Sequence, residues 1–415
     1  MADYLVPWFG PKLTYALAGV VVYTSICHIL RFRRIKSLQH KYGFFTAQRP
    51  TLAGMTDQEA WEIQTEIDEA EFPALFEKGL QLALFRTYGI PSISKLLVQT
   101  AQLSTSENVA KRYADTAVII TEIYADKPTS ETAIEAFARL NYLHGHYLKQ
   151  GRITNDDMLY TLALFMNHPC EWINRYEWRR LTDMEVCAVA TFHKSMGDAM
   201  QIKYDVLPGS KSGWKDGLQF YQELDTWAKD YEKRHMVPHK DNYDTAIKTR
   251  DLMLSTVPSF TRDMVAQIVS AAMDDRLREA VMFEPAYHLV AKLFSVFMTA
   301  RRFYLRHLAL PRFSWQRQKS LSKNTGPEGR RWLNLWSITP HYVKPTIRGR
   351  WGPSGIYRLI LGAPRPGDKD MCLEGYLRSD VGPRAFSGKG KESFEQEKSR
   401  LAKTRTGGCP FVTLK

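Results

Sequence analysis

The chain has 415 residues, of which 44% are hydrophobic, so its length and composition predict a folded protein and exclude a disordered one. Its five cysteines form no C-x-x-C pair, which argues against a structural zinc site and a disulfide scaffold. The net charge of +13 is concentrated beside the first hydrophobic segment and after residue 300. No stacking-aromatic motif accompanies these basic residues, so they favour an anionic membrane face as partner and no nucleic acid.

The first hydrophobic segment runs from Leu13 to Leu30 and contains no Asp, Glu, Lys or Arg. As a helix it would be about 27 Å long, enough to cross a membrane. The basic run RFRRIK follows it, whereas only Lys12 precedes it, so residues 1–12 are predicted on the far side and the rest in the cytosol. A signal peptide would carry its charges before the apolar core. A buried core helix is possible, but the segment is apolar on all sides, and Trp8, Phe9 and Tyr23 suit a membrane interface.

Helical periodicity begins at about Thr51, after a basic neck at residues 31–50. Thr56 and Glu59 are placed as a capping box, and Pro73 divides residues 56–85 into two helices. Five more helices are predicted at residues 92–103, 107–125, 130–150, 155–176 and 182–200. Strand alternation is rare, so the chain is predicted to be all-α with about ten or more helices.

A second hydrophobic run spans Tyr287 to Leu310 and contains Lys292 and three arginines. These charges argue against a second membrane span and favour a core helix with a basic end, which can rest on the bilayer surface. Beyond Pro311 the chain is rich in Lys, Arg, Trp, Gly and Pro. Residues 311–415 are interpreted as a basic C-terminal extension, and about the last thirty are expected to be extended or disordered.

Two histidines, His144 and His146, lie in the helix predicted at residues 130–150. Because residues two apart on a helix differ by about 200° in direction, the two side chains point to opposite sides and cannot chelate one metal ion. His146 falls on the more polar face. His144 falls on the apolar face, together with Phe137, Leu140 and Leu148.

A lone inward histidine has two interpretations. The ordinary one is a buried neutral imidazole that is hydrogen-bonded to a backbone carbonyl. The other is the axial ligand of a haem, because haem iron needs only one strong protein ligand, held on a helix between apolar walls. The pattern around His144 does not choose between them.

The segment FARLNYLHGHYLKQGRITNDDMLYTLALF, residues 137–165, resembles the central motif of the rubber oxygenase (latex-clearing protein) superfamily. The resemblance covers about residues 60–300, including LFRTYGIPSISKLL and EWRRLTDMEVCAVATFHKSMGDAM, and is closest to the fungal ER-bound branch of the mycophenolic-acid type. It implies an all-α fold with one haem b and with His144 as the proximal iron ligand. It also implies O₂-dependent cleavage of a carbon–carbon double bond in a lipophilic, prenylated substrate.

The chain departs from the bacterial members near the implied iron ligand. They carry arginines three residues before and four after it, where this chain has Asn141 and Leu148. Their Arg-x-x-Lys-Thr motif corresponds to KRYADT here, which keeps Arg112 and Thr116 but has Asp115 in place of the lysine. Since that lysine can occupy the sixth iron position, an open or water-bound iron is expected.

Arg112 and Thr116 lie one helical turn apart and are predicted to project together. In the functional interpretation, Arg112 faces a haem propionate or bound oxygen, and Thr116 donates a hydrogen bond. In the alternative, Arg112 pairs with Asp115 on a solvated face. His193 is predicted to support the site or the fold rather than to bind a metal. His168-Pro169-Cys170 is expected to end a helix, and Asp156-Asp157 and Asp68-Glu69 are expected at helix starts and solvated faces.

These observations together predict a single-pass, ER-anchored haem b oxygenase whose helical catalytic domain, residues 51–310, faces the cytosol. Two alternatives stay open. One is a membrane-tethered helical adaptor that kept the fold and lost the iron. The other is a non-haem metallohydrolase that uses His146, His168 or His193 with carboxylates, although no H-E-x-x-H spacing supports it.

Overall fold

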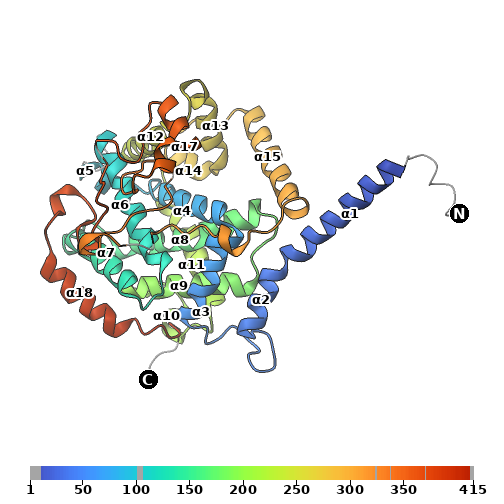
Figure 1. Ribbon diagram of the computed structural model, residues 1–415. Helices are drawn as coiled ribbons and strands as arrows, with labels where there is room; N and C mark the ends of the chain where they lie inside the picture. The colour runs from blue at the N-terminus through green and yellow to red at the C-terminus, as the bar shows by residue number, and fades with distance from the viewer. Residues whose placement is uncertain (1–10, 101–105, 323–324, 337, 370, 412–415) are drawn as a thin grey trace.

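The computed structural model describes residues 11–100, 106–322, 325–336, 338–369 and 371–411, so predicted residues 1–10 and 101–103 lie outside the described part. Within these ranges the protein is built from helices and loops, with isolated β-bridges and no strand (Figure 1). The all-α prediction is therefore confirmed.

The α-helices are α1 (Pro11–Arg31), α2 (Arg33–Tyr42), α3 (Asp57–Glu66), α4 (Pro73–Thr87), α5 (Pro91–Gln99), α6 (Ser106–Ala125), α7 (Glu131–Lys149), α8 (Asn155–Tyr176), α9 (Asp183–Ala199), α10 (Gly209–Ser212), α11 (Gly217–His235), α12 (Lys240–Leu254), α13 (Arg262–Ala272), α14 (Asp275–Ala280), α15 (His288–His307), α16 (Ile347–Trp351), α17 (Pro353–Ile360) and α18 (Lys391–Thr404). A π-helical turn, Ile67–Glu71, joins α3 to α4. Short 3₁₀ turns lie at Ser259–Thr261, Ser314–Gln316, Pro327–Gly329, Arg378–Asp380 and Arg384–Phe386.

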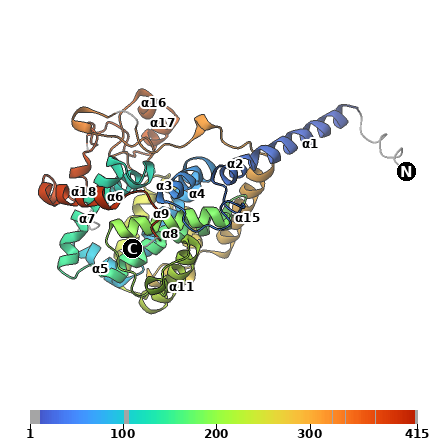
Figure 2. The same cartoon turned by 90° about the horizontal axis from the view of Figure 1, so that it is seen from below.

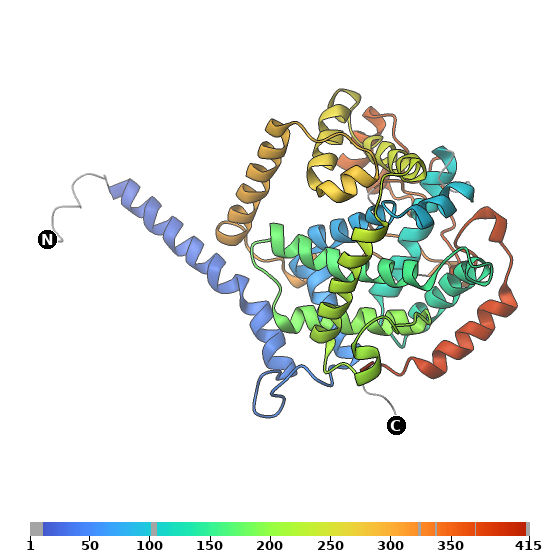
Figure 3. The ribbon, with the colours of Figure 1, turned by 180° about the vertical axis from the view of Figure 1, so that it is seen from behind.

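Helix α1 projects away from the body of the molecule (Figures 1 and 3). The segment Lys12–Tyr42 is the one candidate membrane span in the described chain by length and composition, and its most apolar window is only 6% buried. The base of α1 is attached to the body, because the Tyr23 hydroxyl donates to the Leu308 carbonyl at 2.9 Å. The predicted polar neck contains α2, which buries an apolar face against the body.

The helix starts follow the capping chemistry of the sequence. Thr56 accepts from the Glu59 backbone N–H while the Glu59 side chain accepts from the Thr56 N–H, so the predicted capping box is confirmed. Pro73 opens α4, as predicted. Helices α5 to α9 coincide within a few residues with the five predicted helices wherever the chain is described.

Helix α8 does not end at His168-Pro169-Cys170, so that prediction was wrong. It runs through Pro169 to Tyr176, although the proline provides no N–H for a helical bond. Helix α4 packs closely along α8 and holds it in place. The contact requires Gly79, because a Cβ added there would lie 2.6 Å from the Pro169 Cα.

The second hydrophobic run forms α15, but the predicted core position was wrong. Only Met298 of this helix is fully buried, while Phe297 is 64% exposed. The run carries apolar residues around more than half of its circumference, and the body covers only one side. Helix α15 instead packs against α13, and it also contacts α1 (Figure 3).

The C-terminal segment differs from the expectation of extended or disordered chain in the last thirty residues. Residues 391–404 form α18, which lies beside α7 (Figure 2). The sequence of α18 is densely charged, but Phe394 and Leu401, two turns apart, are both buried. Further upstream, the core also takes in Leu321, Leu333, Tyr342, Val343, Tyr376 and Val381.

Candidate functional site

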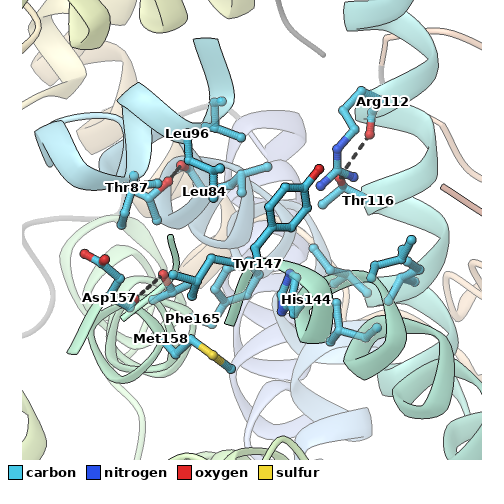
Figure 4. A pocket seen from close by; sticks show the side chains of 18 of the residues that line it. Leu84, Thr87, Leu96, Arg112, Thr116, His144, Tyr147, Asp157, Met158 and Phe165 are labelled. Carbon is cyan, nitrogen blue, oxygen red and sulfur yellow. Dashed lines mark hydrogen bonds between the residues drawn. The ribbon is translucent and has the colours of Figure 1, made fainter. Parts of the chain in front are cut away.

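A cavity of about 300 Å³ lies among α5, α6, α7, α8 and α12 (Figure 4). This volume is at the lower end of the range of small-molecule sites. Most of its wall is apolar, including Leu84, Leu96, Ile119, Leu143, Phe165 and Met196. The polar side chains at the wall include those of His144, Arg112, Thr116, Tyr147 and Arg152, so several polar groups face a largely apolar space.

His144 projects from α7 into this cavity (Figure 4). Burial, together with a smaller contribution from the nearby charge of Arg112, lowers the pKa of its imidazole to about 4, so the ring is neutral at pH 7. Its Nδ1 atom is buried and has no hydrogen-bond partner among the described residues. A buried polar atom without a partner is costly, so this imidazole is available for a ligand that accepts or supplies a bond.

His193 shows the ordinary arrangement of a buried histidine. Its Nδ1 donates to the Val189 carbonyl at 2.7 Å, which leaves Nε2 to accept from the Tyr124 hydroxyl at 2.7 Å. Burial lowers the pKa of this imidazole to about 4 as well. Both ring nitrogens are satisfied and the side chain does not line the cavity, which agrees with the predicted supporting or structural role.

Arg112 and Thr116 project together from α6 into the cavity, as predicted. The Arg112 guanidinium donates to the Thr116 Oγ1 at 2.6 Å, and that hydroxyl donates to the Arg112 carbonyl at 2.9 Å. Asp115 does not pair with Arg112. It is 1% exposed and accepts from Lys111 Nζ at 2.9 Å and from the Tyr342 hydroxyl at 2.7 Å. The position where bacterial relatives are expected to carry a lysine therefore faces the C-terminal segment.

The two positions where arginines were expected from bacterial members lie outside the cavity wall. Asn141 donates from Nδ2 to the Ala199 carbonyl and to the Glu397 side chain, so it joins α7 to α9 and α18. Leu148 is 37% exposed, so the apolar face predicted for α7 ends before its last turn. His146 is exposed and hydrogen-bonded to Gln150, on the opposite side from His144.

Tyr147 and Arg152 are among the cavity residues that sequence reasoning missed. Tyr147 follows His144 by three positions and therefore shares its helix face, a spacing that would have identified it. Arg152 lies in the loop after α7, where no periodicity applies. Its guanidinium donates to Gln99 Oε1 at 2.7 Å and lies 5.5 Å from the centre of the Tyr147 ring.

The described ranges contain no cluster of three or more His, Cys, Asp or Glu side chains that is placed to hold a metal ion. A non-haem metallohydrolase needs such a ligand set. His146, His168 and His193 lie in separate environments and do not provide one. Asp157 belongs to the start of α8, where its backbone N–H donates to Thr154, in agreement with the prediction for the Asp156-Asp157 pair.

Comparison with known proteins gives a consistent set of relatives. A family model described as the catalytic domain of ER-bound oxygenase mpaB/B' and rubber oxygenase matches residues 80–303. The chain is 39% identical over 398 residues to the ER-bound oxygenase mpaB' of Penicillium brevicompactum, which covers 95% of this chain and 94% of that protein. It is 44% identical over 276 residues to mpaB of Penicillium roqueforti, covering 66% and 91% of the two chains. The mpaB protein of Penicillium brevicompactum is 37% identical over 349 residues, with coverages of 84% and 82%.

Proposed function

Because this chain belongs to the family of ER-bound oxygenases mpaB/B' and rubber oxygenases, we propose that it is a haem b-dependent oxygenase with His144 as the axial iron ligand. The family makes the chain an oxygenase that uses O₂ and associates with the ER membrane. The proposed reaction is the oxidative cleavage of a carbon–carbon double bond. The proposed substrate is a lipophilic isoprenoid or prenylated molecule.

The difference between His144 and His193 carries the proposal. Both imidazoles are neutral, but only His193 is fully buried and has hydrogen-bond partners on both nitrogens. His144 faces a cavity with an unpartnered nitrogen, which is the state expected of a side chain whose natural partner is a bound group. A neutral imidazole on a helix between apolar walls fits a haem iron.

The other cavity residues fit the same group. Arg112 and Arg152 are the two guanidinium groups at the cavity wall and would pair with the anionic propionates. When bound, the haem supplies O₂ binding and activation. The chain contributes the neutral His144 ligand and a hydroxyl at Thr116, which Arg112 holds in a fixed position at 2.6 Å. The apolar walls exclude water and accommodate the alkene of the substrate.

The anchor fits a lipophilic substrate. A prenyl chain partitions into the bilayer, and α1 would hold the enzyme close to that bilayer. We propose that α1 crosses the ER membrane once and that the basic residues after it keep the helical body in the cytosol. Glycosylation acceptor sites introduced before residue 11 and after residue 405 would report the two sides. Modification of the C-terminal acceptor would contradict this orientation.

The test of the proposed cofactor compares three detergent-purified proteins that are expressed with haem precursor: the wild type, His144→Ala and His146→Ala. The wild type and His146→Ala should show a Soret band and contain one haem b per chain by pyridine extraction. His144→Ala should lose the band or show a strongly shifted one. His146 is the matched control because it is two residues away and exposed.

Each outcome of this comparison has a direct reading. A colourless wild type that is folded and helical would refute the haem assignment and favour the non-enzymatic, membrane-tethered adaptor. Equal haem content and identical spectra in all three proteins would refute the role of His144 while leaving the cofactor in place. Screening of prenylated substrates is worthwhile only if the wild type binds haem.

A further inference from the structure

A second cavity, of about 180 Å³, lies between α4, α6 and the C-terminal segment. It shares wall residues with the first cavity, among them Thr116 and Tyr124. Asp68 and Glu69 in its wall belong to the π-helical turn Ile67–Glu71, a type of distortion that is frequent at functional sites.

Three polar atoms of the wall of this cavity are buried and have no hydrogen-bond partner among the described residues: Asp68 Oδ1, Trp336 Nε1 and Thr339 Oγ1. Native proteins satisfy nearly all such atoms, so three around one cavity indicate a missing partner. Asp68 was expected on a solvated helix face, and it lies instead at this cavity.

All three groups can donate a hydrogen bond. The indole N–H is only a donor, and the threonine hydroxyl can donate. Burial raises the pKa of the Asp68 carboxyl well above its usual value, with a further contribution from Glu69, which favours the protonated form of this group, the form that can donate. Apart from these groups, much of the wall is apolar and includes Pro73, Phe76, Leu80, Leu84 and Ile120.

We propose that this cavity binds a small lipophilic molecule through a neutral oxygen acceptor, such as a ketone carbonyl, which receives hydrogen bonds from Asp68, Trp336 and Thr339. The site does not depend on the haem assignment, because it uses none of the same donors. An aliphatic hydrocarbon would leave these three groups unpaired, so it is a poor ligand.

The test uses the full-length protein in detergent with two probes of similar shape, acetophenone and ethylbenzene, and measures binding by equilibrium dialysis. Acetophenone should bind more tightly than ethylbenzene to the wild type, with its carbonyl stretch shifted to lower frequency. Trp336→Phe and Thr339→Val should each weaken acetophenone binding by about three- to tenfold, the effect of one lost hydrogen bond, and leave ethylbenzene binding unchanged. Trp315→Phe is the control, because Trp315 is 78% exposed.

Equal affinities for the two probes, or acetophenone binding that neither variant changes, would overturn this proposal and mean that water alone satisfies the three atoms. The melting temperature and helical circular dichroism of each variant establish that it is folded. If Trp336→Phe does not fold, Thr339→Val decides the question.

A different observation, on the surface, concerns the exposed face of α15. Six large apolar side chains of this helix are more than half exposed: Leu289, Leu293, Val296, Phe297, Phe303 and Tyr304. At 3.6 residues per turn they fall within a stripe about 120° wide. The opposite side, with Phe294, Met298 and Leu305, packs against the body.

Basic side chains follow one flank of the apolar stripe. Lys292 and Arg306 are exposed, and Arg302 is half-buried beside them. An apolar face bordered by lysine and arginine is typical of helices that lie in the interface of an anionic membrane. The same charges are too many for a helix that crosses a bilayer.

The end of α15 is attached to the candidate membrane span. Tyr23 donates to the Leu308 carbonyl, and Arg31 donates to the Ala309 carbonyl. The end of α15 therefore lies beside α1 (Figures 1 and 3), and both helices expose large apolar side chains. We infer that α15 lies in the plane of the same membrane interface and that its stripe is buried among the lipids, so the body rests against the bilayer.

The test places a nitroxide on the full-length protein in nanodiscs that contain anionic lipid, at position 289, 293 or 297 through a cysteine substitution. Glu395→Cys, on exposed α18, is the control, and the unsubstituted protein gives the background of the five native cysteines. The three stripe positions should show high collision rates with O₂, low rates with a water-soluble nickel complex, and similar depths.

Collision rates like those at position 395 would overturn this inference, because the stripe would then face water. Dipolar broadening between nitroxides on separate chains would also overturn it, because a second copy would then cover the stripe. Depths that change steadily from 289 to 297 would indicate a helix that penetrates the bilayer instead of lying in its surface.

Discussion

Replacing Arg405 by methionine should destabilise the whole body, because this side chain closes the C-terminal segment onto three earlier parts of the chain. Its guanidinium donates to the Pro128 carbonyl at 2.9 Å, to the Ser195 carbonyl at 3.0 Å and to Asp57 Oδ2 at 3.4 Å. It also lies 4.6 Å from the centre of the Phe137 ring, on the helix that carries His144.

The size of the expected destabilisation follows from the burial of the Arg405–Asp57 pair. Arg405 is only 8% exposed, and burial raises the pKa of Asp57 to about 6 even though the guanidinium opposes this. Removing one partner of a buried pair costs about 3–5 kcal/mol. With an unfolding entropy of about 2.1 cal/mol/K per residue over the whole chain, this corresponds to a fall in melting temperature of roughly 3–6 °C.

The assay is thermal unfolding in detergent followed by helical circular dichroism. Lys403→Met is the matched control, because it removes a charge two residues earlier from an exposed position and should change the free energy of unfolding by less than about 0.5 kcal/mol. Arg405→Met combined with Asp57→Asn should recover part of the loss, since no carboxylate is then left unpaired. An Arg405→Met single variant with the same melting temperature as Lys403→Met would refute the reasoning.

Three further predictions concern stability. Between about pH 4 and pH 6 the folded protein retains a proton on Asp57 that the unfolded chain has lost. The free energy of unfolding should therefore fall by about 3 kcal/mol as the pH rises through this range. Asp57→Asn should flatten this part of the pH profile of the melting temperature. Gly79→Ala should lower the melting temperature although alanine favours helices, because its methyl group would overlap Pro169 at a cost of about 1–3 kcal/mol; a rise would contradict the packing of α4 on α8. Lys111→Met should cost about 1–3 kcal/mol in urea unfolding, because the buried carboxylate of Asp115 loses its cation, and an unchanged midpoint would mean that this pair contributes nothing.

The sequence predicted the helices well where local signals agree. Thr56, Ser130, Thr154 and Thr182 each cap a helix start with their own side chain, so the boundaries of α3, α7, α8 and α9 are encoded within a few residues. The projection of Arg112 with Thr116 also follows from helix geometry alone. Local chemistry was sufficient for these features because each depends on residues three or four positions apart.

Other features depend on contacts that no local pattern encodes. Asp115 is oriented by Tyr342, 227 residues further along the chain, so its direction could not be read from KRYADT. Pro169 continues a helix because Gly79 on another helix lets the two backbones approach closely. The exposure of α15 was also missed, because an apolar stripe looks the same in a sequence whether protein or lipid covers it.

The position of Arg405 has a consequence for the synthesis of this protein. Its partner Asp57 precedes it by 348 residues. At about 5–20 residues per second, Arg405 is therefore synthesised roughly 17–70 s after Asp57. By then α1 and the helices around both cavities have already been synthesised. The body is thus completed from its C-terminal end, and a chain released early would lack the side chain that joins α3, α7 and α9.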